Sequence, residues 1–60
     1  MSTEFIPLFK VPKESWVETE DGHRFFFDHL DGMYSYCTEI GGGISHYSCG
    51  IKVKPVEGPK

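Results

Sequence analysis

Five side chains in this 60-residue chain belong to types that bind metals or act as nucleophiles: His23, His29, Cys37, His46 and Cys49. His46 and Cys49 are separated by two residues, a spacing that occurs at zinc sites. Zinc sites with firm sequence signatures have two such close ligand pairs, however, and the chain contains no C-x-x-C pair. We therefore predict no metal site, with the thiols buried and the histidines at the rim of the fold.

The cysteines also bear on redox state and catalysis. The chain does not open with a basic segment and an apolar run, so we expect no signal peptide and a cytoplasmic location. Cysteines in that setting are mostly reduced, so free thiols are expected, with a Cys37–Cys49 disulfide as the alternative. A Cys–His dyad, or His29 oriented by Asp28 or Asp31, can be written down, but no pattern marks these groups as activated. We predict a protein that is not an enzyme and needs no cofactor.

The net charge and the distribution of apolar residues disfavour two kinds of partner, nucleic acid and membranes. The net charge is −3, from six Lys and Arg against nine Asp and Glu. Surfaces that bind nucleic acid normally show a Lys/Arg excess, so nucleic acid is disfavoured as a partner. No segment approaches the roughly 18 consecutive apolar residues of a membrane span, so no membrane association is expected. Five Phe, three Tyr and one Trp are the main source of buried surface in so short a chain.

The spacing of apolar residues predicts strands rather than helices. Phe, Tyr, Val, Ile and Thr dominate, and glycine-containing turns recur at short intervals. Strands are expected at residues 15–20, 23–30 and 33–40, and residues 44–55 are expected to form one long strand or two short ones, with Gly50 as a bulge or bend. Asp-Gly turns at 21–22 and 31–32 and the glycine run 41–43 separate these segments.

The predicted fold class is all-β: a small SH3-like or partly open barrel of four to five antiparallel strands. Residues 1–60 form a single domain. Pro7 and Pro12 lack N–H donors, so residues 1–12 are expected to be an extended arm or edge strand. Residues 56–60 are expected to be a loose tail.

Turn registers divide the side chains between two faces. Two-residue Asp-Gly turns pair Glu20 with His23 and Leu30 with Met33. Because side chains alternate along a strand, each face can be listed. The predicted core face carries Val17, Phe26, Leu30, Met33, Cys37, Tyr47, Cys49, Ile51 and Val53. The predicted aromatic face carries Trp16, Phe25, Phe27, His29, Tyr34, Tyr36, Ile40 and His46.

The aromatic face needs a cover, because a solvated antiparallel sheet usually has one polar face. The N-terminal arm, closure of a barrel, a second subunit or a partner protein could supply it. Aromatic side chains anchor protein interfaces, although any single ring in so small a domain could simply belong to the core. The candidate partner-binding residues are Trp16, Phe25, Phe27, His29, Tyr34 and Tyr36.

The segment FFFDHLDGMYSYC, from Phe25 to Cys37, resembles a hairpin in small uncharacterised accessory proteins of tailed bacteriophages. The preceding KVPKESWVETEDG fits the same pattern, so the resemblance covers about half of the chain. It brings no established chemistry to these residues. It implies a phage product that acts in the bacterial cytoplasm, where it docks on a host protein and modulates or inhibits it.

We therefore expect a small non-catalytic protein-binding accessory protein with a host protein as its partner. One alternative is a single-stranded nucleic-acid-binding small β-barrel, which would need Lys and Arg among its aromatic residues. Another is an obligate homodimer with a structural role, whose aromatic face is the subunit interface.

Overall fold

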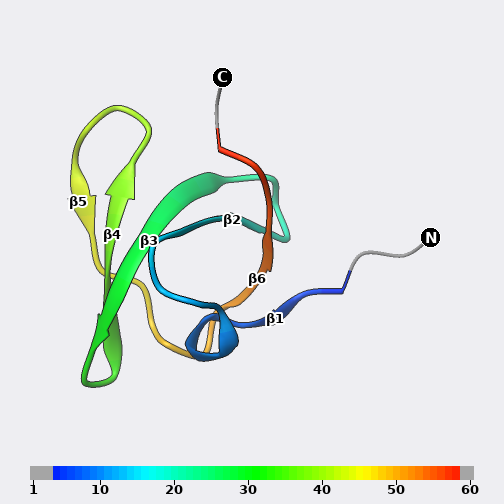
Figure 1. Ribbon diagram of the computed structural model, residues 1–60, viewed down its shortest axis with the longest axis horizontal. Helices are drawn as coiled ribbons and strands as arrows, with labels where there is room; N and C mark the ends of the chain where they lie inside the picture. The colour runs from blue at the N-terminus through cyan, green and yellow to red at the C-terminus, as the bar shows by residue number, and fades with distance from the viewer. Residues whose placement is uncertain (1–3, 59–60) are drawn as a thin grey trace.

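A computed structural model describes residues 4–58 as one antiparallel sheet of six strands that does not close into a barrel (Figure 1). The strands are β1 (Ile6–Pro7), β2 (Ser15–Thr19), β3 (Arg24–Asp31), β4 (Tyr34–Glu39), β5 (Ile44–Ser45) and β6 (Lys52–Pro55), with a short 3-10 helix η1 (Leu8–Lys10). Their order across the sheet is β1-β6-β2-β3-β4-β5. The all-β, partly open prediction is confirmed. Two-residue strands at the edges, β1 and β5, bring the number of strands above the expected four to five.

The C-terminal strand β6 lies between the two N-terminal strands β1 and β2. Val53 is opposite Ile6 on one side and opposite Thr19 on the other. The contact with β2 extends one residue beyond β6, because the N–H of Val56 donates a hydrogen bond to the carbonyl of Trp16 over 3.0 Å. The remaining parts of the expected arm and tail, residues 1–3 and 59–60, lie outside the described residues.

The core fills the concave side of the sheet, which we call the inner face; the opposite side is the outer face. Its buried members come from β2, β3, β4, β6 and the η1 region: Leu8, Val11, Val17, Phe25, Phe27, Cys37 and Val53. The η1 region closes one end of this core, since the N–H of Leu8 donates to the carbonyl of Ile51 over 2.9 Å. Segments from both ends of the chain therefore pack together (Figure 1).

The loop between β2 and β3 is one residue longer than predicted. The N–H of Thr19 donates to the carbonyl of His23 over 2.8 Å, so residues 20–22 form a three-residue loop. Val17 consequently lies opposite Phe25, one position earlier than the predicted register. The two-residue turn predicted from Asp-Gly is wrong.

This one-residue slip exchanges the faces of the first half of β3. Phe25 and Phe27, predicted to lie in the exposed aromatic face, are 0% and 2% exposed in the core. Phe26, predicted to be core, lies on the outer face opposite Trp16, with the ring centroids 5.5 Å apart.

A β-bulge at Asp28 separates the two halves of β3. Phe27 is opposite Cys37 and His29 is opposite Tyr36, so Asp28 is the extra residue on its strand. Strict alternation would place Phe27 and His29 on the same face. The bulge instead leaves Phe27 inside and puts His29 on the outer face.

The turn between β3 and β4 also differs from the prediction. Asp31 pairs with Tyr34, so Gly32 and Met33 form the turn, one residue later than expected. Gly32 has φ of +68°, which suits the first central position of a type II′ turn. Leu30 and Met33 were predicted to be core, but they are 37% and 76% exposed. The tip of this hairpin therefore extends beyond the core.

Candidate binding surface

Four rings gather on the outer face of the β3–β4 hairpin, and we call them the outer aromatic array: His29, Tyr34, Tyr36 and His46. The rings of His29 and Tyr36 are stacked, with centroids 4.8 Å apart and an interplanar angle of 19°. His46 meets Tyr36 edge to face, at 4.7 Å and 84°. Tyr36 is still 38% exposed and Tyr34 is 60% exposed. The array is thus an ordered group of rings that solvent reaches.

Strand pairing positions the array. Tyr34 and Tyr36 are two residues apart on β4 and share a face, while His29 is brought opposite Tyr36 by β3. His46 follows β5, and its Nδ1–H donates to the carbonyl of Ser35 over 3.0 Å. Ser35 itself is buried and accepts a hydrogen bond at Oγ from the N–H of Tyr47 over 3.1 Å. These bonds hold the segment after β5 against β4 and fix the His46 ring.

The hairpin that carries the array is anionic. The sequence has no Lys or Arg between Arg24 and Lys52, whereas Asp28, Asp31 and Glu39 lie in that interval. Asp31 is opposite Tyr34 in the pairing and so shares its face. Within residues 4–58 no cationic side chain forms an ion pair with Asp31.

Two cations on β3 and β6, Arg24 and Lys54, interact with groups other than Asp31. Arg24 Nε donates to Glu18 Oε1 over 2.7 Å, and Lys54 Nζ lies 4.0 Å from Glu18 Oε2. Lys54 also lies over the ring of Phe5, 5.4 Å from its centroid. These interactions belong to β2, β6 and the N-terminal segment, so they leave the charge of the hairpin tip uncompensated.

A second group lies on the inner face, and we call it the inner cluster: the rings of His23, Phe25 and Tyr47 together with the carboxylate of Glu39. Tyr47 stacks on Phe25 with centroids 4.2 Å apart and an interplanar angle of 11°. The Tyr47 hydroxyl donates to Glu39 Oε2 over 2.5 Å, and His23 Nε2 lies 2.7 Å from Glu39 Oε1. The hydrogen bond from Tyr47 is the main cause that lowers the pKa of Glu39. Burial, followed by the neighbouring Glu39 carboxylate, raises the pKa of Tyr47 to about 12.

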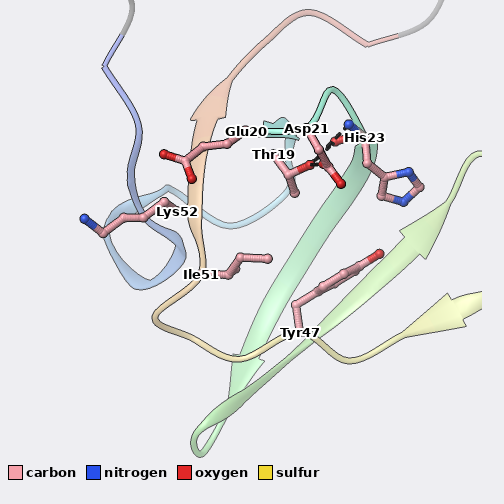
Figure 2. A pocket seen from close by; sticks show the side chains of 7 residues that line it. All are labelled: Thr19, Glu20, Asp21, His23, Tyr47, Ile51 and Lys52. Atoms are coloured by element: carbon pink, nitrogen blue, oxygen red, sulfur yellow. Dashed lines mark hydrogen bonds between the residues drawn. The ribbon is translucent and has the colours of Figure 1, made fainter.

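An open depression of about 420 Å³ lies beside the inner cluster. Its lining residues are Thr19, Glu20, Asp21, His23, Tyr47, Ile51 and Lys52 (Figure 2). Figure 2 shows the β2–β3 loop across the opening from Tyr47 and Ile51. Thr19 Oγ1 donates to Asp21, which lowers the pKa of that carboxyl. Thr19 bonds Asp21 here, and His23 and Tyr47 both bond Glu39, so these four lining side chains already have partners within the fold.

The structure separates the six candidate residues into three groups. His29, Tyr34 and Tyr36 come together in the outer aromatic array. Trp16 lies elsewhere on the outer face, against Phe26 and the tail: a Cβ on Gly58 would lie 2.5 Å from the Trp16 Nε1. Phe25 and Phe27 are core residues, so the register that exposed them is wrong and a partner cannot reach them in this fold.

His46 was not among the candidate partner-binding residues, although the sequence placed it on the same predicted face as Tyr36. Its position depends on the bond to the Ser35 carbonyl, which comes from tertiary pairing between β4 and the segment after β5. A histidine that directly follows a two-residue strand carries no local signal of that contact.

Both cysteines are free, with Cys37 buried and Cys49 half-buried. Burial is the main cause that raises the pKa of the Cys37 thiol, which disfavours its reactive thiolate. Among residues 4–58 no three or more His, Cys, Asp or Glu side chains are grouped so that they could hold a metal ion.

Neither the protein-family models, nor the curated proteins, nor the solved structures contain a match to this chain. In the part of the chain that the structure describes, no helix has the length and apolar character to cross a membrane.

Proposed function

We propose that this chain is a small non-catalytic protein-binding accessory protein and that the outer aromatic array is its docking surface. The observation that carries the proposal is the exposure of two tyrosines, Tyr34 and Tyr36, beside two ordered histidine rings. Tyrosine is enriched at interfaces because its ring gives contact area and its hydroxyl gives a hydrogen bond. Met33, in the turn beside Tyr34, adds an exposed apolar side chain at the tip of the hairpin.

The rings of the array contribute less to the fold than those of the inner cluster. No hydrogen bond joins the hydroxyl of Tyr34 or Tyr36 to another of the described residues, whereas the Tyr47 hydroxyl is bonded to Glu39. The core cluster contains no residue from the turn of the hairpin. Polar tips that are free in the isolated chain are available to a partner.

The resemblance of the Phe25–Cys37 hairpin to tailed-phage accessory proteins supports a host bacterial protein as the partner. On this proposal the chain works in the host cytoplasm and modulates or inhibits the protein on which it docks. Single-stranded nucleic acid is the weaker alternative, because a groove for phosphates needs cations among the rings and the hairpin carries carboxylates instead.

The test is affinity capture from bacterial lysate with three versions of the protein: the wild type, a Tyr34→Ala/Tyr36→Ala variant, and a Phe9→Ala control. Phe9 is an exposed aromatic residue in η1, outside the array. We expect a partner that the wild type and the control capture and the double variant does not. Circular dichroism of each variant checks that the fold is retained. Identical captured sets for all three versions, or no captured protein, would contradict the proposal.

A further inference from the structure

We infer that the segment docking on the outer aromatic array is cationic, with an arginine of the partner over the tyrosine rings and next to Asp31. This inference rests on the proposed function and specifies its partner. It follows from the combination of exposed rings and uncompensated negative charge on one face of the β3–β4 hairpin.

The exposed rings of the array favour a cationic partner. A cation within about 6 Å of an aromatic centroid is attracted by the negative face of the ring, and arginine can also stack flat against it. Within residues 4–58, Lys54 makes such a contact with the Phe5 ring. Tyr34 is the more exposed of the two tyrosines in the array, and within residues 4–58 no cation lies over it.

The carboxylates beside these rings also favour a cationic partner. Asp31 shares the outer face with Tyr34, and Asp28 is the bulge residue beside His29, with 3.3 Å between its Oδ1 and the His29 Nδ1. An arginine over Tyr34 could also pair with the Asp31 carboxylate. Because the guanidinium donates in two directions from a planar group, one side chain can satisfy both contacts.

The same charges argue against two other occupants. A phosphate backbone would meet carboxylates at the tip of this hairpin, because its one cation, Arg24, lies at the start of β3 and pairs with Glu18. In a twofold dimer through the array, each patch faces its own copy, so the Asp31 carboxylates of both chains would lie at one interface. Like charges at an interface are unfavourable unless they are compensated.

The probe is a fluorescein-labelled peptide of alternating glycine and arginine, compared with a peptide in which citrulline replaces every arginine. Citrulline keeps the shape of the side chain and removes the charge. Fluorescence anisotropy at low and high salt measures binding to the intact protein. We expect the arginine peptide to bind about tenfold more tightly than the citrulline peptide, a factor equal to about 1.4 kcal/mol, and to weaken as salt is added.

Two charge variants locate the binding site. Asp31→Thr removes the carboxylate beside the outer aromatic array and keeps a residue suited to a strand. Glu20→Gln is the control and removes one negative charge from the β2–β3 loop. We expect weaker binding of the arginine peptide by Asp31→Thr and by Tyr34→Ala/Tyr36→Ala, and wild-type binding by Glu20→Gln. Equal binding of the arginine and citrulline peptides, or equal effects of the two charge variants, would overturn the inference.

The two proposals can fail separately. If lysate capture depends on Tyr34 and Tyr36 but the arginine peptide does not bind, the partner is not cationic and the docking surface stands. If the double tyrosine variant captures the same proteins as the wild type, the docking surface itself is wrong. A dimer in sedimentation that the double tyrosine variant abolishes would assign the array to a second copy of this chain and would contradict the cationic partner.

Discussion

The protein contains two groups of tyrosine and histidine rings, one on each face of the sheet. In the inner cluster the Tyr47 ring is stacked on Phe25 and its hydroxyl is bonded to Glu39. In the outer aromatic array Tyr36 is stacked on His29 at a similar distance, but no hydrogen bond joins its hydroxyl to another of the described residues. The residue types are alike, and the difference lies in whether the polar tip is used within the fold. In a small aromatic-rich domain, that difference separates rings that build the fold from rings that are available to a partner.

The largest effect should come from removing the ring at the centre of the inner cluster. Phe25→Ala leaves a cavity in the core and is expected to lower the free energy of unfolding by about 3–5 kcal/mol, a large fraction of the total stability of a small domain. Urea denaturation followed by circular dichroism measures it. Phe26→Ala, on the outer face, is the matched control and should cost clearly less. Equal losses would show that the two faces do not differ as described.

The hydrogen bond of the inner cluster should have a smaller effect. Tyr47→Phe keeps the stacked ring and removes the donor to Glu39, so we expect a loss of about 1 kcal/mol. The same denaturation experiment on Glu39→Gln shows whether the carboxylate charge matters. If Tyr47→Phe is as stable as the wild type, the polar tip does not contribute to the inner cluster.

The pH dependence of stability gives a second test of the hydrogen bond between Tyr47 and Glu39. The pKa of Glu39 is lowered in the folded state from its ordinary 4.5, mainly by the Tyr47 hydroxyl. The unfolded chain therefore binds a proton more readily, and the stability from this carboxylate, present above pH 4.5, is lost as pH falls through the lowered pKa. Thermal unfolding between neutral and acidic pH should show a shallower decline in Tyr47→Phe than in the wild type. Identical slopes would mean that Tyr47 does not set the pKa of Glu39.

The smallest effect on stability is expected in the outer aromatic array. Tyr36→Ala removes an exposed ring and should change the free energy of unfolding by about 0.5 kcal/mol. Its effect should appear in partner capture instead. A loss of several kcal/mol would place Tyr36 with the structural rings and remove the contrast between the two groups.

The sequence predicts much of this architecture. Alternation and Asp-Gly turns predicted the three central strands, and they placed His29, Tyr34 and Tyr36 on a common face. Loop length was not predictable, because a glycine in the left-handed region suits both the two-residue turn and the three-residue loop that residues 20–22 form. That single residue decided whether Phe25 was buried.

The pairing of segments that lie far apart in the sequence could not be predicted from local sequence patterns. Nothing in the Lys52–Pro55 strand specifies that it lies between β1 and β2, because that position depends on the register of Val53 with both neighbours. The position of His46 depends in the same way on the carbonyl of Ser35.

The bulge at Asp28 has an evolutionary consequence. At the bulge, β3 contains one residue more than the facing part of β4. Phe27, before the bulge, still lies in the core, and His29, after the bulge, lies on the outer face. A one-residue length change at this position leaves both faces intact, whereas the same change elsewhere in the strand would exchange them. Bulges also bend a strand and increase its twist, so Asp28 helps to set the direction in which the hairpin tip points. Selection could therefore vary the outer aromatic array and its orientation without altering the side chains on which folding depends.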